Sequence, residues 1–428
     1  MISTLLIFMQ RVILSFFLLI IGLVTFASPA DTLHHWGVSL SGMPSKVVAL
    51  DKYQRKWMKA GNNGSIALEL LHTALPSDSD SFANDFGYPT LAIGLRYTMN
   101  GAVRMHRRQD PTWGLAEEVD YDSHLGNTLS LFGSFYRALH RSWHWETSYS
   151  LSGGIGFNRK WYNKYDAIDN ELIGTPVLIY FGAGVYQTYH FATSWGLRAG
   201  FEFVHHSNGA LYRPNKGSNS IGPSIGLVYY PYYKTLVNKR HSFQSLPFKK
   251  YWYLNVAASM GAKTLLEDWL LTQFNTPSTE SDYRTEHFRI YPAYSLQTDV
   301  MYRYARRWAS GIGIECFYGT YASHIKDLDE QRGVEEKHSP WSVGVAGKHE
   351  VFYHNLSLAM AFGFYLYRQM GENARHNESI FYEKIGVHYS FPSLNGLKVG
   401  ISVKAHETKA DLTEVIVTYP IKLYNVRR

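Results

Sequence analysis

The sequence predicts an all-β protein, an antiparallel outer-membrane β-barrel of about 16 strands arranged as two related eight-stranded repeats. Three observations predict this fold: an N-terminus typical of export, long segments in which apolar and polar residues alternate, and a regular contrast between short and long connections. The composition agrees with it. Charged residues are 18% of the 428 and aromatic residues 15%, whereas globular proteins have about 25% charged residues.

The first 30 residues have the pattern of a signal peptide. Arg11 precedes an apolar run over 12–27, and the small-residue stretch 27–30 suits cleavage. An uncleaved anchor helix is the alternative. No later apolar stretch reaches the roughly 18 residues of a membrane-spanning helix, so we expect an exported chain that has no further helical span.

Long alternating segments predict strands that are apolar on one face only. Within 195–203 the odd positions are apolar, and the even positions are charged or glycine. The segments 142–157 and 356–366 alternate in the same way. These runs exceed the roughly 5–6 residues of typical globular strands and reach the roughly 9–11 that a transmembrane strand needs.

Sixteen strand candidates follow from this pattern. The first eight lie near 35–43, 63–73, 88–98, 126–138, 142–157, 174–187, 193–206 and 219–231, and the second eight near 251–264, 287–305, 309–320, 341–351, 354–367, 380–391, 396–406 and 412–424. Short turns such as 138–141 alternate with long connections such as 99–125, which is typical of outer-membrane barrels. The connection 74–87 breaks this rule, because a short turn is expected there.

The two halves of the chain resemble each other at a spacing of 200 residues. The shared positions are Gly196-Leu197, Gly200, His206 and Ala210 in the first half and Gly396-Leu397, Gly400, His406 and Ala410 in the second. Duplication explains the match, and convergent barrel patterning is the alternative. We expect a signal peptide at 1–30, a first repeat at 31–231, a linker at 232–250 and a second repeat at 251–428. The linker joins either two closed barrels or two halves of one 16-stranded barrel.

Candidate catalytic side chains gather in one hairpin, 205–219. His205 and Ser207 are two residues apart on a strand, so they share its apolar face with Phe203, and in a barrel that face points to lipid. The next strand starts at Asn219, whose position has the parity of that strand's apolar residues. His205 is placed to take the Ser207 proton for attack on an ester carbonyl, and Asn219 to set the histidine tautomer.

Three more residues of this hairpin are candidates to bind the oxyanion or the substrate: Asn208, Asn215 and the backbone amide of Gly217. The alternative is that a His and a Ser at a strand end only contact lipid headgroups. No cofactor or metal is expected, since Cys316 is the single cysteine and the remaining histidines are scattered. Nucleic-acid motifs are absent, and the net charge of +7 suits an anionic lipid surface.

The motif His-x-Ser-Asn followed by Pro-Asn-x-Gly, over 205–217, resembles the signature of the PagL-type lipid A 3-O-deacylase (acyloxyacyl hydrolase-like) family. The resemblance spans about 31–231. It implies an eight-stranded outer-membrane barrel that hydrolyses an ester-linked acyl chain of lipid A with a His-Ser-Glu triad on its outer wall. The roles it implies are base for His205, nucleophile for Ser207, and oxyanion contacts for Asn208, Asn215 and Gly217. Asn219 stands where the family pattern has Glu, which predicts a slower enzyme or a different orienter of the imidazole.

The second repeat lacks these catalytic residue types. Ala405 and Glu407 occupy the positions of the base and the nucleophile, so we expect a non-catalytic repeat. His206, in contrast, recurs there on the inward face. We therefore expect His206 to be a structural residue whose partners are Glu202 and Arg198.

Together these features predict a serine esterase of the bacterial outer membrane. Its substrate is expected to be the lipid A of lipopolysaccharide, its surroundings outer-membrane lipids, and its mechanism a Ser-His-Asn one without cofactor. The alternative is a non-catalytic barrel, either a pore or a structural protein, descended from the same family.

Overall fold

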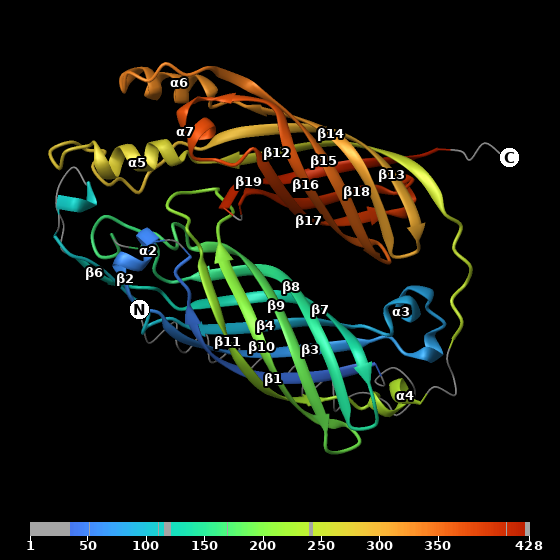
Figure 1. Ribbon diagram of the computed structural model, residues 1–428. Helices are drawn as coiled ribbons and strands as arrows, with labels where there is room; N and C mark the ends of the chain where they lie inside the picture. Colours follow the sequence, from blue (N-terminus) through green and yellow to red (C-terminus); the bar gives the residue numbers. More distant parts are fainter. Residues whose placement is uncertain are drawn as a thin grey trace.

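The computed structural model describes residues 35–423 except 51, 110, 115–120, 169, 239–242 and 408. The signal peptide predicted at 1–30 lies outside the described residues. The described chain forms two closed antiparallel barrels of eight strands each, which lie side by side (Figure 1). The predicted all-β fold with two eight-stranded repeats is confirmed, and it takes the form of two barrels instead of one 16-stranded barrel.

The first barrel follows the chain order, and pairing of its first and last strands closes it. Its strands are β1 (Trp36–Val47), β3 (Asn62–Thr73), β4 (Thr90–Met99), β7 (Thr128–Arg141), β8 (Trp145–Asn158), β9 (Val177–His190), β10 (Trp195–Ser207) and β11 (Ser218–Tyr229). The connecting segments hold η1 (Pro76–Asp78), α3 (Ser81–Phe86), η2 (Pro111–Trp113) and α2 (Lys52–Trp57), and α4 (Tyr233–Val237) follows the barrel.

A separate three-stranded sheet is formed by β2 (Met58–Ala60), β5 (Arg104–Arg107) and β6 (Tyr121–His124). Its strands have only three or four residues. The sequence pattern did not predict them, because a segment this short cannot show a clear alternation.

The second barrel is built in the same way and is closed by pairing of β12 with β19. Its strands are β12 (Tyr251–Lys263), β13 (Tyr291–Ala305), β14 (Trp308–Gly319), β15 (His338–Tyr353), β16 (Leu356–Met370), β17 (Phe381–Phe391), β18 (Leu397–His406) and β19 (Lys409–Lys422), with η4 (Pro392–Leu394) in the turn between β17 and β18. Its long connections carry α5 (Leu266–Phe274), α6 (Ala322–Gln331) and α7 (Gly371–His376). These helices lie with α2 at one end of the molecule, while short turns lie at the other (Figure 1). Among the described residues, no helix combines the length and the apolar character needed to cross a membrane.

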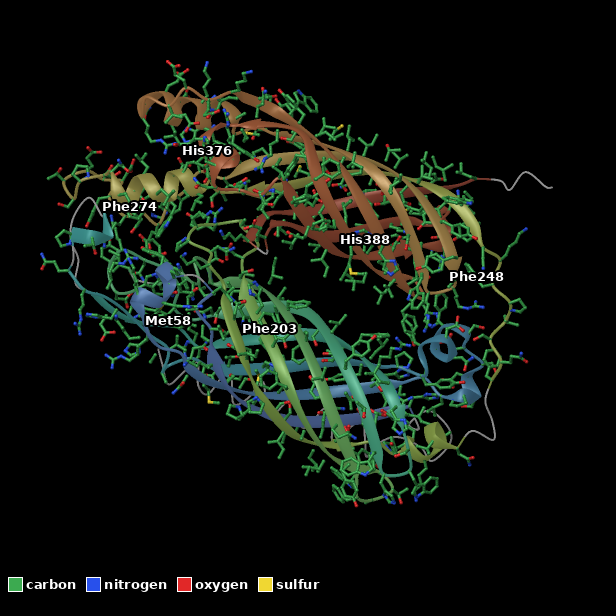
Figure 2. All side chains as sticks on the ribbon, viewed as in Figure 1. Met58, Phe203, Phe248, Phe274, His376 and His388 are labelled. Atoms are coloured by element: carbon green, nitrogen blue, oxygen red, sulfur yellow. The ribbon has the colours of Figure 1, made fainter. Side chains whose placement is uncertain are left out.

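Both barrels present apolar side chains outward and polar ones inward. Phe201 on β10 is 49% exposed and Val399 on β18 is 37% exposed, whereas Glu202 and Lys398 beside them are buried. Phe203 lies on the outer wall of the first barrel (Figure 2). The outward direction predicted for these apolar positions is confirmed, and it follows from the period of two along a strand.

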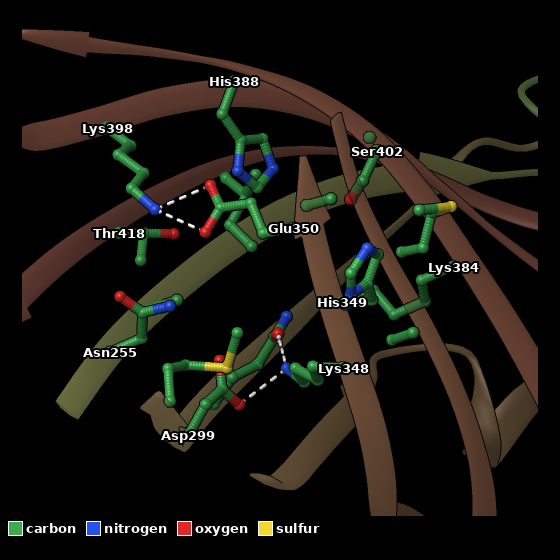
Figure 3. A pocket seen from close by; sticks show the side chains of 18 of the residues that line it. Asn255, Asp299, Lys348, His349, Glu350, Lys384, His388, Lys398, Ser402 and Thr418 are labelled. Atoms are coloured by element: carbon green, nitrogen blue, oxygen red, sulfur yellow. Dashed lines mark hydrogen bonds and ion pairs between the residues drawn. The ribbon is translucent and has the colours of Figure 1, made fainter. Parts of the chain in front are cut away.

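Paired charges fill the barrel interiors. In the first barrel Arg96 forms an ion pair with Glu202 at 2.5 Å. In the second, Lys398 lies 2.7 Å from Glu350 and Lys348 lies 2.7 Å from Asp299 (Figure 3). Buried charges are tolerated when they are paired, so these contacts allow both lumens to remain polar. The cavity that Figure 3 shows has a volume of about 60 Å³.

The two barrels contact each other at the end with the short turns. Asp85 accepts a hydrogen bond from Nε of Arg306 at 3.2 Å, and Asp80 lies 2.7 Å from Nε2 of His354. Asn84 also donates to the hydroxyl of Ser245 in the linker, at 2.8 Å. These acidic and amide groups belong to the connection 74–87, so the one connection that is too long for a turn supplies a contact between the barrels.

A second contact between the barrels lies at the end with the long loops. Tyr162 from the β8–β9 connection is buried in a cluster with Trp269 of α5 and Phe288. Its hydroxyl donates to the carbonyl of Arg284 at 2.9 Å. The loop end of the first barrel is therefore packed against residues of the second.

Candidate active site

The pairing of β10 with β11 brings the three predicted catalytic side chains together. His205 lies directly opposite Asn219 in the strand register, and Ser207 ends β10 two residues later. Nδ1 of His205 is 2.7 Å from Oδ1 of Asn219, and Nε2 is 2.9 Å from Oγ of Ser207. The imidazole thus bridges the amide and the hydroxyl through its two nitrogens.

This geometry determines the proton positions that the site can use. Because Oδ1 of Asn219 is an acceptor, it receives the Nδ1–H of His205. In that neutral tautomer Nε2 carries a lone pair and can accept the Ser207 proton. Hydrogen-bond contact between a hydroxyl nucleophile and a base, with a third group that orients the base, is the arrangement required for nucleophilic catalysis.

The side chains of the site are more buried than side chains on the lipid-facing wall of the barrel. Ser207 is 6% exposed and Asn219 is 5% exposed, while Phe201 on the same strand face is 49% exposed. Two connections meet at this point of the barrel: the backbone N–H groups of Lys216 and Gly217 donate to the carbonyls of Glu171 and Leu172 at 3.0 and 2.9 Å. The expectation of a lipid-facing Ser207 therefore needs correction, since the side chain keeps its outward parity but is shielded.

Asn208 and Asn215 are joined to each other within the β10–β11 loop. The backbone N–H of Asn208 donates to Oδ1 of Asn215 at 2.9 Å, and Nδ2 of Asn208 donates to the carbonyl of Tyr212, also at 2.9 Å. Within the part of the chain that the structure describes, Nδ2 of Asn215 has no hydrogen-bond partner. Asn215 thus retains a free donor, and Asn208 determines its direction.

Gly217 has a different role from the one expected of it. Its backbone N–H is already donated to Leu172, so an oxyanion contact from this amide does not fit the arrangement. A Cβ at this position would lie 2.6 Å from Cε1 of His205, and its φ is +75°. Glycine is needed here for both reasons, and it leaves space for the His205 imidazole.

His206 is a buried interior residue, as its parity predicts, but its partners differ from those expected. Nε2 of His206 lies 2.8 Å from Oγ of Ser130, and its ring contacts Tyr180 edge-on. Glu202 is instead paired with Arg96. Arg198 is hydrogen-bonded to the hydroxyl of Tyr230, the residue after the neighbouring strand β11, which the alternation along one strand could not predict.

One group of potential metal ligands occurs among the described residues, in the second barrel. Ligand atoms of Glu378, His406 and Asp411 lie within 4.8 Å of one another. Basic side chains already neutralise both carboxylates: Lys263 and Lys404 pair with Asp411, and Arg368 with Glu378. Because three cationic groups oppose a metal ion at this point, we interpret the group as an ion-pair network.

Sequence reasoning missed the contribution of the second barrel to this site. The carbonyl of Gly209, two residues after Ser207, accepts a hydrogen bond from Oγ1 of Thr413 at 2.7 Å. The two residues are 204 positions apart, and no motif or periodicity connects them. The repeat was the available signal that the two halves belong together, but it does not indicate which surfaces meet.

Comparisons with known proteins bear on the same hairpin. Two family profiles match the chain: "Lipid A 3-O-deacylase (PagL)" over residues 91–228 and "Acyloxyacyl hydrolase, C-terminal domain" over 252–423. The resemblance carried by the motif at 205–217 is confirmed by the first match. The second match spans most of the second barrel. No curated protein sequence matches the chain.

The solved structures similar to this chain include bacterial porins and channels. A mutant of the Rh. blastica porin is 9% identical, with a TM-score of 0.16, over 90% of this chain and 99% of that one. An outer membrane channel from Pseudomonas putida F1 is 8% identical, with a TM-score of 0.21, over 93% of this chain and all of that one.

Proposed function

Because the chain belongs to the PagL lipid A 3-O-deacylase family of bacterial outer-membrane proteins, we propose that it is a serine esterase that removes an ester-linked acyl chain from lipid A. Ser207 is the nucleophile, His205 the general base and Asn219 the group that orients the imidazole. The observation that carries the proposal is the continuous hydrogen-bonded series Asn219–His205–Ser207, with distances of 2.7 and 2.9 Å.

The reaction follows from the proton positions. Oγ of Ser207 attacks the ester carbonyl while Nε2 of His205 takes the hydroxyl proton. The tetrahedral intermediate collapses, the proton passes from His205 to the departing sugar oxygen, and the acyl group stays on Ser207. Water, activated by the same imidazole, then releases the fatty acid. Nδ2 of Asn215 is the donor assigned to the developing oxyanion, and Asn208 holds it in place.

Asn219 distinguishes this site from the triad of the family pattern. Its amide oxygen sets the tautomer of His205 as a carboxylate would, but it brings no negative charge to the imidazolium that forms during attack. The expected consequence is a slower chemical step with unchanged substrate binding, because only the transition state carries that positive charge.

The location of Ser207 suits a lipid substrate. It ends β10 at the rim of the barrel that carries the long loops, and in outer-membrane barrels the long loops are extracellular. On the outer wall of the same strand Phe201 and Phe203 lead away from the site toward the membrane interior. An acyl chain can lie along this wall and bring its ester to the headgroup level, where Ser207 lies beneath the loop that shields it.

A pore is the weaker alternative. The interior cavity of the second barrel measures about 60 Å³ and that of the first about 10 Å³. Cavities of this size hold at most a few water molecules, and buried ion pairs cross the lumen of each barrel. A purely structural role of the barrel does not account for the hydrogen-bonded series Asn219–His205–Ser207.

The direct test is Ser207→Ala, with lipid A from expressing cells analysed by mass spectrometry. The wild-type chain should convert penta-acyl to tetra-acyl lipid A and release fatty acid, and the variant should lose at least about 10³-fold of that rate. Ser194→Ala, at the opposite end of the same hairpin, is the matched control and should retain full activity. Acyl release by Ser207→Ala at the wild-type rate would overturn the proposal.

A further inference from the structure

The second barrel holds the loop that follows Ser207. Oγ1 of Thr413 donates to the carbonyl of Gly209 at 2.7 Å, and the backbone N–H of Thr264 donates to the carbonyl of Ala210 at 3.3 Å. Two successive peptide units directly after Ser207 and Asn208 are therefore bonded to strand β19 and to the end of β12. The first barrel alone cannot make these contacts.

Backbone conformation and packing at this contact are unusually constrained. Gly209 and Ala210 both have positive φ, at 63° and 70°, a conformation that a residue with a Cβ rarely adopts. Ala210 is completely buried. A Cβ at Gly209 would lie 2.0 Å from Oγ1 of Thr413, so the strand of the second barrel approaches the loop as closely as glycine permits. Such conformations persist only where the surroundings impose them.

Tyr212 of the same loop also contacts the second barrel, and Arg213 is influenced by its charges. The hydroxyl of Tyr212 donates to the carbonyl of Glu286 at 2.7 Å and accepts from the N–H of Phe288 at 3.1 Å. Burial lowers the pKa of Arg213, and three carboxylates of the second barrel oppose this shift: Glu267, Asp411 and Glu378. The loop is thus held at positions 209, 210 and 212, and carboxylates of the second barrel favour the charged form of Arg213.

These contacts lead to the predicted oxyanion donor. Asn208 precedes the two held peptide units, its N–H is bonded to Asn215, and its amide is bonded to the carbonyl of Tyr212. We propose that the second barrel supports the active site of the first, and that Thr413 is a positioning residue for the Asn208–Asn215 pair beside Ser207. This inference rests on the proposed function, because it assigns Thr413 a part in the same reaction.

The experiment compares Thr413→Val, which removes the donor but keeps the shape, with Thr413→Ser, which keeps the donor. The purified full-length chain is assayed on detergent-dispersed lipid A. Thr413→Val should lower kcat about tenfold and leave KM within twofold, and Thr413→Ser should restore at least half of the wild-type kcat. Thr320→Val is the matched control, since Thr320 makes a hydroxyl-to-carbonyl bond of the same length, to Pro292, wholly within the second barrel.

A second variant covers the case in which Thr413→Val does not fold, as judged by heat-modifiable migration on a gel. Tyr212→Phe removes only the hydroxyl that reaches Glu286 and Phe288, and it should lower kcat severalfold. If Thr413→Val folds and has the wild-type kcat, the inference is wrong. If Thr413→Val does not fold, a wild-type kcat for Tyr212→Phe overturns the inference instead. Failure of this inference can be distinguished from failure of the proposed function. If the proposed function is wrong, Ser207→Ala remains active; if only this inference is wrong, Ser207→Ala is still inactive.

Discussion

The seventh strands of the two barrels, β10 and β18, have the same frame and different chemistry. Both direct alternate apolar residues outward, and both place a buried histidine on the inward face, His206 and His406. At the loop end, His205 lies opposite Asn219 in the first barrel, whereas Ala405 lies opposite Ala410 in the second. The barrel frame therefore does not require His and Asn at these two positions, and among the described strands their presence here distinguishes the first barrel from the second.

The connections after these strands differ as well. β10 and β11 are separated by residues 208–217, while β19 begins at Lys409, three positions after His406 ends β18. The short hairpin has no loop in which an asparagine pair like Asn208 and Asn215 could lie. The comparison teaches that the candidate site consists of two additions to a plain barrel: a hydrogen-bonded pair across two strands, and a loop long enough to shield it.

The largest effect that sharpens this comparison is expected from His205→Ala, which makes the first barrel resemble the second at position 205. Loss of the base should lower acyl release from lipid A by at least about 10³-fold, because Ser207 and His205 act as one unit. The measurement is the ratio of tetra-acyl to penta-acyl lipid A by mass spectrometry. Unchanged heat-modifiable migration would show that the barrel still folds, and full activity would contradict the role of His205.

Asn219 should have the next largest effect. Asn219→Ala removes the acceptor that orients His205 and is expected to cost about 10²-fold in kcat, less than loss of the base. Asn219→Glu restores the carboxylate of the family pattern beside Nδ1 and should preserve or raise activity. Initial rates of fatty-acid release measure both variants. A Glu variant as impaired as the Ala variant would show that charge at this position does not help the imidazole.

Gly217→Ala should have a smaller effect, about tenfold in kcat. The new Cβ would lie 2.6 Å from Cε1 of His205 and would sit at a φ of +75°, which displaces the imidazole and costs about 1–2 kcal/mol of backbone strain. Gly153→Ala is the control, because a Cβ there meets nothing within 4 Å. Equal kinetics for the two variants would mean that His205 does not depend on the space at Gly217.

The smallest effect is expected in the second barrel. Glu407→Ala should leave lipid A deacylation unchanged within twofold, because position 407 has neither a base nor a loop beside it. A sharper version places Ala405→His and Glu407→Ser together in a Ser207→Ala chain, and this variant should remain inactive because Ala410 cannot orient the new imidazole. Deacylase activity in that variant would contradict the comparison, because it would show that the barrel frame with a His and a Ser is enough for the reaction.

Much of the fold could be predicted because alternation is a local property. Each strand of 10 or more residues, such as β10 with 13, shows its two faces without reference to any partner. The segments that escaped prediction are those without a period. The three-residue strand β2 is one example. The connection 74–87 is another, because its length becomes understandable only from its contacts with the other barrel, such as those with Arg306 and His354.

For the site, the sequence by itself determined which side chains share a face. The spacing of His205 and Ser207 and the parity of Asn219 follow from the two-residue period. Only the tertiary structure decided that the register of β10 and β11 places His205 directly opposite Asn219. It also decided that the backbone N–H of Gly217 donates to the carbonyl of Leu172 and that Thr413 contacts Gly209. The physical reason is range: faces depend on neighbours along one strand, whereas register, shielding and contacts between barrels depend on surfaces that meet only after both barrels have closed.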